Sequence, residues 1–253
     1  MIRRAGYNCA HANFDNDSIK SEATVQLKST RLILVFVICL FTVVALQAQS
    51  SPAPSSAAPS SAAQSSPAPS RPLTAEERDV ALKSLQATRD GFLQSIAGLS
   101  EKQWRFKPAP DRWSIAEVAE HITVSESTIL GLVQTKFVAG PATPERRAEV
   151  KFTDDQLLTR IPDRSHKAQA PEILKPTGRW ANREELTKAF ESERQATMEY
   201  VKTTQEDLRD HFGPHPSLGT LDAYQWILLI SAHSERHTKQ IEEVKADPNF
   251  PKD

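Results

Sequence analysis

The sequence has little cysteine, little glycine and almost no net charge, and each shortage excludes a class of protein. Two cysteines among 253 residues supply neither a disulfide framework nor an all-thiolate zinc site. A formal net charge of −1 argues against a nucleic-acid partner, because phosphate recognition needs a concentrated basic surface. The chain also lacks a glycine-rich phosphate loop and a G-x-S-x-G nucleophile motif. Its function must therefore rest on other side chains.

The chain also has no apolar run of the roughly 20 residues that a membrane-spanning helix needs. Its longest run, LILVFVICLFTVVAL at residues 32–46, has fifteen uncharged residues. Lys28 and Arg31 precede this run and Ala48 follows it, an order that is typical of a cleaved secretory signal peptide. We therefore expect a signal peptide at 28–48 and an exported protein, periplasmic or secreted. The protein would contact a membrane only through this segment, if it stays uncleaved.

The segments on either side of the expected signal peptide show no pattern of a folded domain. Residues 1–27 are polar, and we hypothesise that translation starts later, at a non-AUG codon such as that of Val25 or Leu27. Residues 49–72 form a linker, because all but one of residues 50–70 are Ser, Ala or Pro. Such a tract buries no apolar surface, so we expect it to be extended and disordered.

Both cysteines, Cys9 and Cys39, lie before this linker. An exported domain without cysteine can fold in an oxidising compartment without mispaired disulfides.

Residues 73–247, followed by a short tail at 248–253, predict an all-α fold, a four-helix bundle. Apolar residues recur at helical spacing in four long stretches, and no stretch alternates convincingly over a strand length. The four helices are expected to begin at Thr74, Ser114, Asn182 and about Thr220. The connection at 141–181 is long for a bundle and contains a short helical pattern at Asp154–Ile161.

Three histidines lie on the apolar faces of two predicted helices. His233 and His237 are four residues apart, so they share one face of the last helix, and His121 lies beside the apolar stripe of the second helix. Buried imidazoles are costly unless they are paired, and a divalent metal pairs them well. Three protein ligands leave one coordination position for water or substrate. The spacing therefore indicates a metal site on His121, His233 and His237.

Other interpretations of these residues stay open from spacing alone. A H-x-x-x-H pair near a helix C-terminus is also typical of solvated histidines stabilised by the helix dipole. Glu117, one turn before His121, is either a partner of that histidine or only the end of a capping box. We expect His211 and His215 in loops and assign no role to His166. Glu235 and Arg236 are expected to form surface pairs. The three tryptophans expected in the core are Trp104, Trp113 and Trp226.

Three ordered motifs resemble the DinB-like (DinB/YfiT) superfamily. They are KPAPDRWSIAEVAEHI at 107–122, KPTGRWANREEL at 175–186 and HPSLGTLDAYQWILLISAHSERHTKQI at 215–241. The resemblance implies a four-helix bundle, often a homodimer, that carries a divalent ion, commonly nickel, zinc or iron, on three histidines. The positions that match are His121, His233 and His237.

The resemblance implies a metal-dependent enzyme with a small-molecule substrate, either a hydrolase or an S-transferase. Export counts against the thiol cofactors that some relatives use, because small thiols are scarce outside the cytoplasm. Two alternatives remain. One is a non-catalytic domain in which the metal joins the second helix to the last, and the other is a helical interaction domain with a vestigial histidine triad.

Overall fold

The computed structural model describes residues 71–166 and 169–252. The expected leader, the signal peptide and nearly all of the linker therefore lie outside the described residues. Within the described part, no helix is both long and apolar enough to cross a membrane.

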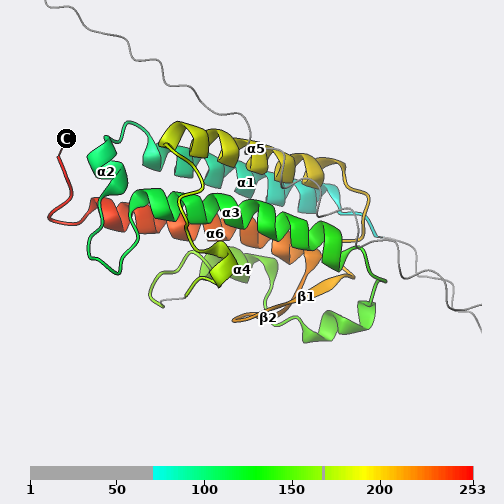
Figure 1. Ribbon diagram of the computed structural model, residues 1–253. Helices are drawn as coiled ribbons and strands as arrows, with labels where there is room; N and C mark the ends of the chain where they lie inside the picture. Colours follow the sequence, from blue (N-terminus) through cyan, green and yellow to red (C-terminus); the bar gives the residue numbers. More distant parts are fainter. Residues whose placement is uncertain (1–70, 167–168, 253) are drawn as a thin grey trace, which may run out of the picture. The chain divides into compact units, whose positions relative to one another are not determined.

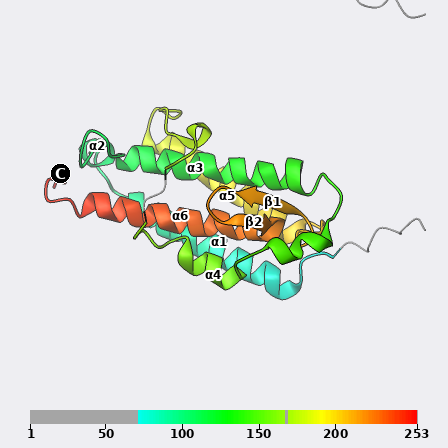
Figure 2. The same ribbon diagram turned by 90° about the horizontal axis from the view of Figure 1, so that it is seen from below.

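Four long helices form the body of the domain: α1 (Ala75–Ile96), α3 (Ile115–Leu132), α5 (Arg183–Thr203) and α6 (Ala223–Lys245). Each packs against two others, since both α6 and α5 contact α1 and α3. Figures 1 and 2 show the four axes lying nearly along one direction, with α3 and α6 side by side. The predicted four-helix bundle is confirmed.

Side-chain caps begin three of these helices where the sequence predicts. The hydroxyls of Thr74 and Ser114 each accept a hydrogen bond from the backbone N–H of the third residue of the helix. The carboxylate of that third residue accepts a hydrogen bond from the backbone N–H of the capping residue. Asn182 caps α5 in the same way, without the return bond. The helix expected from about Thr220 begins instead at Ala223, capped by Asp222.

The delay in α6 arises from a β-hairpin, which corrects the all-α prediction. Strand β1 (Phe212–His215) pairs antiparallel with β2 (Gly219–Asp222). Each strand has only four residues, too few for a visible alternation of polar and apolar positions. Gly219 permits the turn because its φ is 78°, in the left-handed region. His215 thus ends a strand and does not lie in a loop as predicted.

The connections hold short helices. These are α2 (Glu101–Arg105), the π-helical turn η1 (Val133–Phe137), η2 (Pro144–Glu149), α4 (Asp154–Arg160) and η3 (Glu172–Leu174). Helix α4 confirms the short helix expected at Asp154–Ile161, and it packs against α6. Segment η3 lies against α3, so the long connection reaches the face that carries His121.

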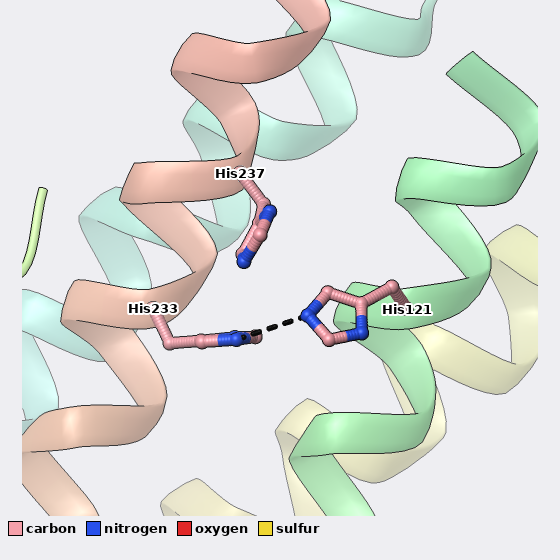
Figure 3. A group of neighbouring side chains, drawn as sticks. All are labelled: His121, His233 and His237. Carbon is pink, nitrogen blue, oxygen red and sulfur yellow. Dashed lines mark hydrogen bonds between the residues drawn. The ribbon is translucent and has the colours of Figure 1, made fainter. Parts of the chain in front are cut away.

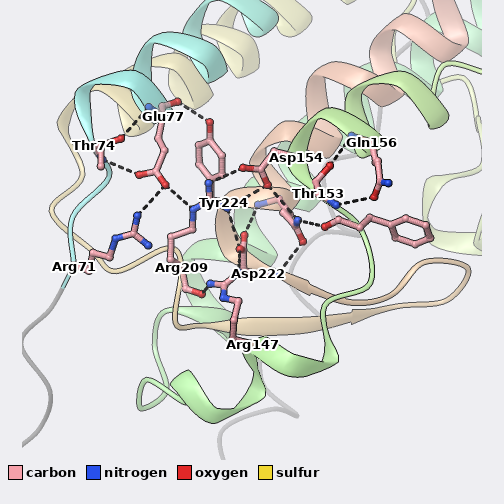
Figure 4. Close-up of polar contacts among 12 residues, drawn as sticks. Arg71, Thr74, Glu77, Arg147, Thr153, Asp154, Gln156, Arg209, Asp222 and Tyr224 are labelled. Carbon is pink, nitrogen blue, oxygen red and sulfur yellow. Dashed lines mark hydrogen bonds and ion pairs between the residues drawn. The ribbon is translucent and has the colours of Figure 1, made fainter.

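A network of ion pairs joins the hairpin to the bundle. The Arg209 guanidinium binds Glu77 of α1 at 2.9 Å, Asp154 of α4 at 2.6 Å and Asp222 at 3.1 Å. Arg147 also binds the fully buried Asp222 and donates to the Arg209 carbonyl. Figure 4 shows these side chains converging where α1, α4 and the hairpin meet. The network fixes the entry to α6, the helix that carries His233 and His237.

The core consists of two apolar clusters, one centred on α1, α6 and the hairpin and the other on α1, α3 and α5. Trp104 and Trp226 are buried, as predicted, whereas Trp113 is only partly buried. The bundle interior also encloses an ion pair between Arg194 of α5 and Glu126 of α3, both fully buried. Buried charges of this kind must be completely paired, so this pair fixes α3 relative to α5.

Candidate metal centre

The three predicted histidines meet between α3 and α6. One ring nitrogen from each of His121, His233 and His237 lies within 4.8 Å of the other two. The Nε2 atoms of His121 and His233 are 3.2 Å apart. Figure 3 shows the rings of His233 and His237 reaching from α6 toward the ring of His121 on α3. The structure thus assembles all three side chains in one cluster.

Local helical geometry places the pair on α6. The four-residue spacing puts His233 and His237 one turn apart on one face. Trp226 and Ile230 precede them on the same face, and both are buried against the bundle. His121 follows the buried Val118 by one turn of α3 and is only 2% exposed. The apolar stripes that pack the two helices together therefore also bring the imidazoles together.

Hydrogen bonds fix which nitrogen of two rings carries the proton. His121 Nδ1 lies 2.8 Å from the Leu174 carbonyl, which can only accept, so Nδ1 is the donor. His237 Nδ1 lies 2.8 Å from Gln240 Oε1, and Arg164, which can only donate, points at the same oxygen. Nδ1 of His237 is therefore also a donor. In the neutral rings, Nε2 of His121 and of His237 each keep a free lone pair.

Burial keeps the cluster neutral. Burial lowers the pKa of His121 and outweighs the hydrogen bond to Leu174, which would raise it. Burial, followed by the charges of the other two rings, lowers the pKa of His233. The pKa of His237 falls to about 3, again chiefly through burial. At neutral pH all three imidazoles thus offer lone pairs, the form that binds a metal.

The donor set and its spacing fit a divalent ion. Two imidazole nitrogens bound to one tetrahedral ion at about 2.0–2.1 Å lie about 3.3 Å apart, close to the 3.2 Å between His121 and His233. The same distance suits an N–H···N hydrogen bond from His233 to His121. That bond, however, leaves the Nε2 lone pair of His237 without a hydrogen bond to any described residue. The cluster is therefore consistent with a metal site.

Glu120, the residue before His121 on α3, is a buried carboxylate that the sequence analysis did not single out. Its carboxylate is 5% exposed and accepts from the backbone N–H groups of Thr177 at 2.7 Å and Gly178 at 2.9 Å. The Arg179 guanidinium adds a contact at 2.9 Å. Burial would raise the pKa of Glu120, but these donors lower it overall. Glu120 thereby holds the segment whose Leu174 carbonyl orients His121.

Glu117 has the capping role and not the metal-site role. Its carboxylate accepts from the Ser114 backbone N–H at 2.7 Å and pairs with Lys107. Trp113, expected in the core, lies with its ring centroid 5.1 Å from that of His121. It therefore covers one side of the cluster.

Two residues between His233 and His237 form different contacts. Glu235 forms the expected surface pair, with Lys239. Arg236 does not, because its guanidinium donates to the carbonyl oxygens of Ile161, Asp163 and His166 in the long connection.

The other three histidines that the structure describes lie outside the cluster. His166 is exposed in the connection. His211 is buried, with Nδ1 at 2.6 Å from the Asp207 carbonyl and Nε2 at 3.0 Å from the Gly140 carbonyl. His215 packs its ring beside Trp226, and its Nδ1 accepts from the backbone of the hairpin turn.

Comparison with known proteins decides the family. The profile of the DinB superfamily matches residues 84–241, more than half of the chain. The chain belongs to the DinB superfamily. This match begins within α1, ends within α6 and includes all three clustered histidines.

Three proteins illustrate the similarity of this DinB domain to others. YuaE of Bacillus subtilis (strain 168), named as an uncharacterized protein, is 25% identical over 150 residues, which cover 59% of this chain and 88% of YuaE. YfiT from Bacillus subtilis is described as "a probable metal-dependent hydrolase with an unusual four-helix bundle topology". It is 14% identical, with a TM-score of 0.46, over 73% of this chain and 94% of its own. TT2238, described as a four-helix bundle protein, is 19% identical, with a TM-score of 0.41, over 66% of this chain and 98% of its own.

Proposed function

We propose that this DinB-family domain binds one divalent ion through His121, His233 and His237 and hydrolyses a small-molecule substrate there. The observation that carries the proposal is the convergence of three neutral imidazoles, two of them fixed with Nε2 lone pairs. Imidazole ligands suit nickel, zinc and iron. An ion held by these residues would supply a Lewis acid and would bring the pKa of water toward neutrality.

The chain's own residues would bind and orient the ion and limit access to it. Three protein ligands leave a position open to an outside molecule. The Leu174 carbonyl and the Gln240 amide hold two rings in their binding orientation. The Trp113 ring lies against His121, and His121 itself is buried. We prefer hydrolysis over S-transfer because the signal-like segment at 28–48 supports export. Small thiols, which an S-transferase needs, are scarce outside the cytoplasm.

Metal analysis of the full-length protein tests the site. We expect about one divalent ion per chain in the wild type, as a three-histidine site holds one, and its loss in His233→Ala. His166→Ala is the matched control, because it removes an exposed imidazole outside the cluster. Full metal content in His233→Ala would contradict the assignment.

A second measurement separates a hydrolase from a domain that the metal only stabilises. The metal-loaded protein is assayed against a panel of small carboxylic esters and amides, with His121→Ala as the inactive reference. Turnover that disappears in His121→Ala supports the hydrolase. A coordination sphere filled by protein atoms alone would contradict it and favour the metal as a link between α3 and α6.

A further inference from the structure

A buried hydroxyl close to the histidine cluster has no partner. Ser125 of α3 is 1% exposed, and its Oγ forms no hydrogen bond to any residue that the structure describes. A second buried hydroxyl without a partner among the described residues is that of Tyr200 on α5. The other buried serine and threonine hydroxyls on the long helices bond to a carbonyl of their own helix. These are Ser95 to Phe92, Thr123 to Ala119, Thr197 to Glu193, Ser231 to Leu228 and Ser234 to Ile230. A buried hydroxyl without a bond is costly, so the unpaired hydroxyl of Ser125, unlike those of the other buried serines and threonines, indicates a ligand.

Helix geometry directs this hydroxyl toward the cluster. Ser125 follows His121 by four residues, which places the two side chains about 40° apart around α3 and one above the other. Each Cα–Cβ bond leans toward the helix N-terminus, so the Ser125 side chain leans toward the turn of His121. The same face of α3 packs against α6, where His233 lies 3.2 Å from His121.

The composition of the cluster favours an anionic occupant. Among the described residues, the group that could hold an ion contains three histidines and no carboxylate. Neutral imidazoles leave the charge of a divalent ion uncompensated. A ligand that brings its own negative oxygen balances this charge, and a serine hydroxyl can donate to that oxygen.

We propose that Ser125 Oγ donates a hydrogen bond to the acyl oxygen of a carboxylic ester or amide, and to the carboxylate that its hydrolysis leaves, at the open position of the three-histidine site. This inference rests on the proposed function. It adds the class of substrate and a fourth binding residue, which comes from α3 and lies one turn from His121.

Acetate binding to the cobalt-loaded full-length protein tests the inference without an activity assay. Cobalt content is measured first, and acetate is then titrated while the visible spectrum of the Co²⁺ centre is recorded. Ser125→Ala should take up cobalt as the wild type does and bind acetate at least about tenfold more weakly, the loss expected for one hydrogen bond to a charged acceptor. Ser95→Ala is the matched control, because its hydroxyl bonds within α1, and its acetate affinity should equal that of the wild type.

Thermal unfolding of the metal-free protein gives an independent result. Ser125→Ala should leave the Tm unchanged or raise it, since it removes an unpaired hydroxyl, whereas Ser95→Ala should lower the Tm. An equal drop in both variants would mean that Ser125 serves the fold, and would overturn the inference. Normal cobalt uptake with acetate affinity unchanged within twofold would also overturn it while leaving the proposed function intact. Absence of cobalt from the wild type would overturn both.

Discussion

The carboxylate of Glu120 should control metal affinity although it touches none of the three histidines. It receives two short backbone bonds, from Thr177 and Gly178, and one from the Arg179 guanidinium. These contacts hold the segment that contains the Leu174 carbonyl, the acceptor for His121 Nδ1. The informative perturbation is Glu120→Gln, which keeps the size of the side chain and removes its charge.

The expected loss follows from these contacts. Hydrogen bonds to a charged acceptor are worth about 1.5–3 kcal/mol each. The amide of Gln keeps one acceptor oxygen and turns an NH₂ group toward donors, so at least one bond is lost outright. Arg179 is partly exposed, which reduces its share. We therefore expect Glu120→Gln to lower the free energy of unfolding by about 2–4 kcal/mol. Loss of a group that orients a ligand costs about 10–100-fold in metal affinity.

Zinc affinity, measured by competition with a chromophoric chelator, tests this reasoning, together with amide exchange at Thr177 and Gly178. The matched control is Glu117→Gln, on the same helix, which affects only the cap of α3 and the Lys107 pair. It should leave zinc affinity unchanged. If exchange at Thr177 and Gly178 accelerates in Glu120→Gln while zinc affinity stays at the wild-type value, the segment does not orient His121 and the reasoning is refuted.

Three further predictions address the bundle and the site. Glu126→Gln should lower the free energy of unfolding by about 3–5 kcal/mol in urea denaturation, because it leaves the buried Arg194 charge unpaired; a loss below about 1 kcal/mol would contradict this. Gly213→Ala should lower the free energy of unfolding by about 1–3 kcal/mol and change tryptophan fluorescence. The reason is that a Cβ at this position would lie 2.2 Å from the Phe137 ring, which packs on Trp226. Unchanged fluorescence and stability would refute the close packing. Zinc at 100 times its Kd should raise the free energy of unfolding by about 2.7 kcal/mol, and a chelator should reverse the gain.

The sequence predicts the parts of this fold that depend on local signals. Thr74, Ser114 and Asn182 mark helix starts correctly, because a cap needs only the residue and the N–H groups that follow it. The short strands at Phe212–His215 and Gly219–Asp222 are not visible, because four residues are too few to show an alternation of polar and apolar positions. The partners of Arg236 are not visible either, because they lie at least seventy residues away in the sequence.

The candidate site also has a part that the sequence predicts and a part that it does not. The spacing of His233 and His237 and the apolar stripe around His121 predict that the rings face each other, and they do. The groups that orient them are less visible. Gln240, three residues after His237, could have been found from helical spacing. The Leu174 carbonyl could not, because a backbone oxygen has no sequence signal. Glu120 lies outside the apolar stripe, where a carboxylate resembles a solvent-exposed residue.

Helix α3 shows why hydrophobic periodicity finds the helix but not its function. Successive residues are rotated by about 100° around a helix, so Glu120 bonds to the long connection alone, whereas His121 reaches both that connection and α6. Glu126 faces α5 and binds Arg194. Ser125 shares the face of His121. Helix α3 thus directs buried polar groups toward three neighbours, which are the long connection, α6 and α5. The role of each group depends on the residue that it contacts on the neighbouring element. A rotation of α3 about its axis would therefore disturb both the Glu126–Arg194 ion pair and the histidine cluster.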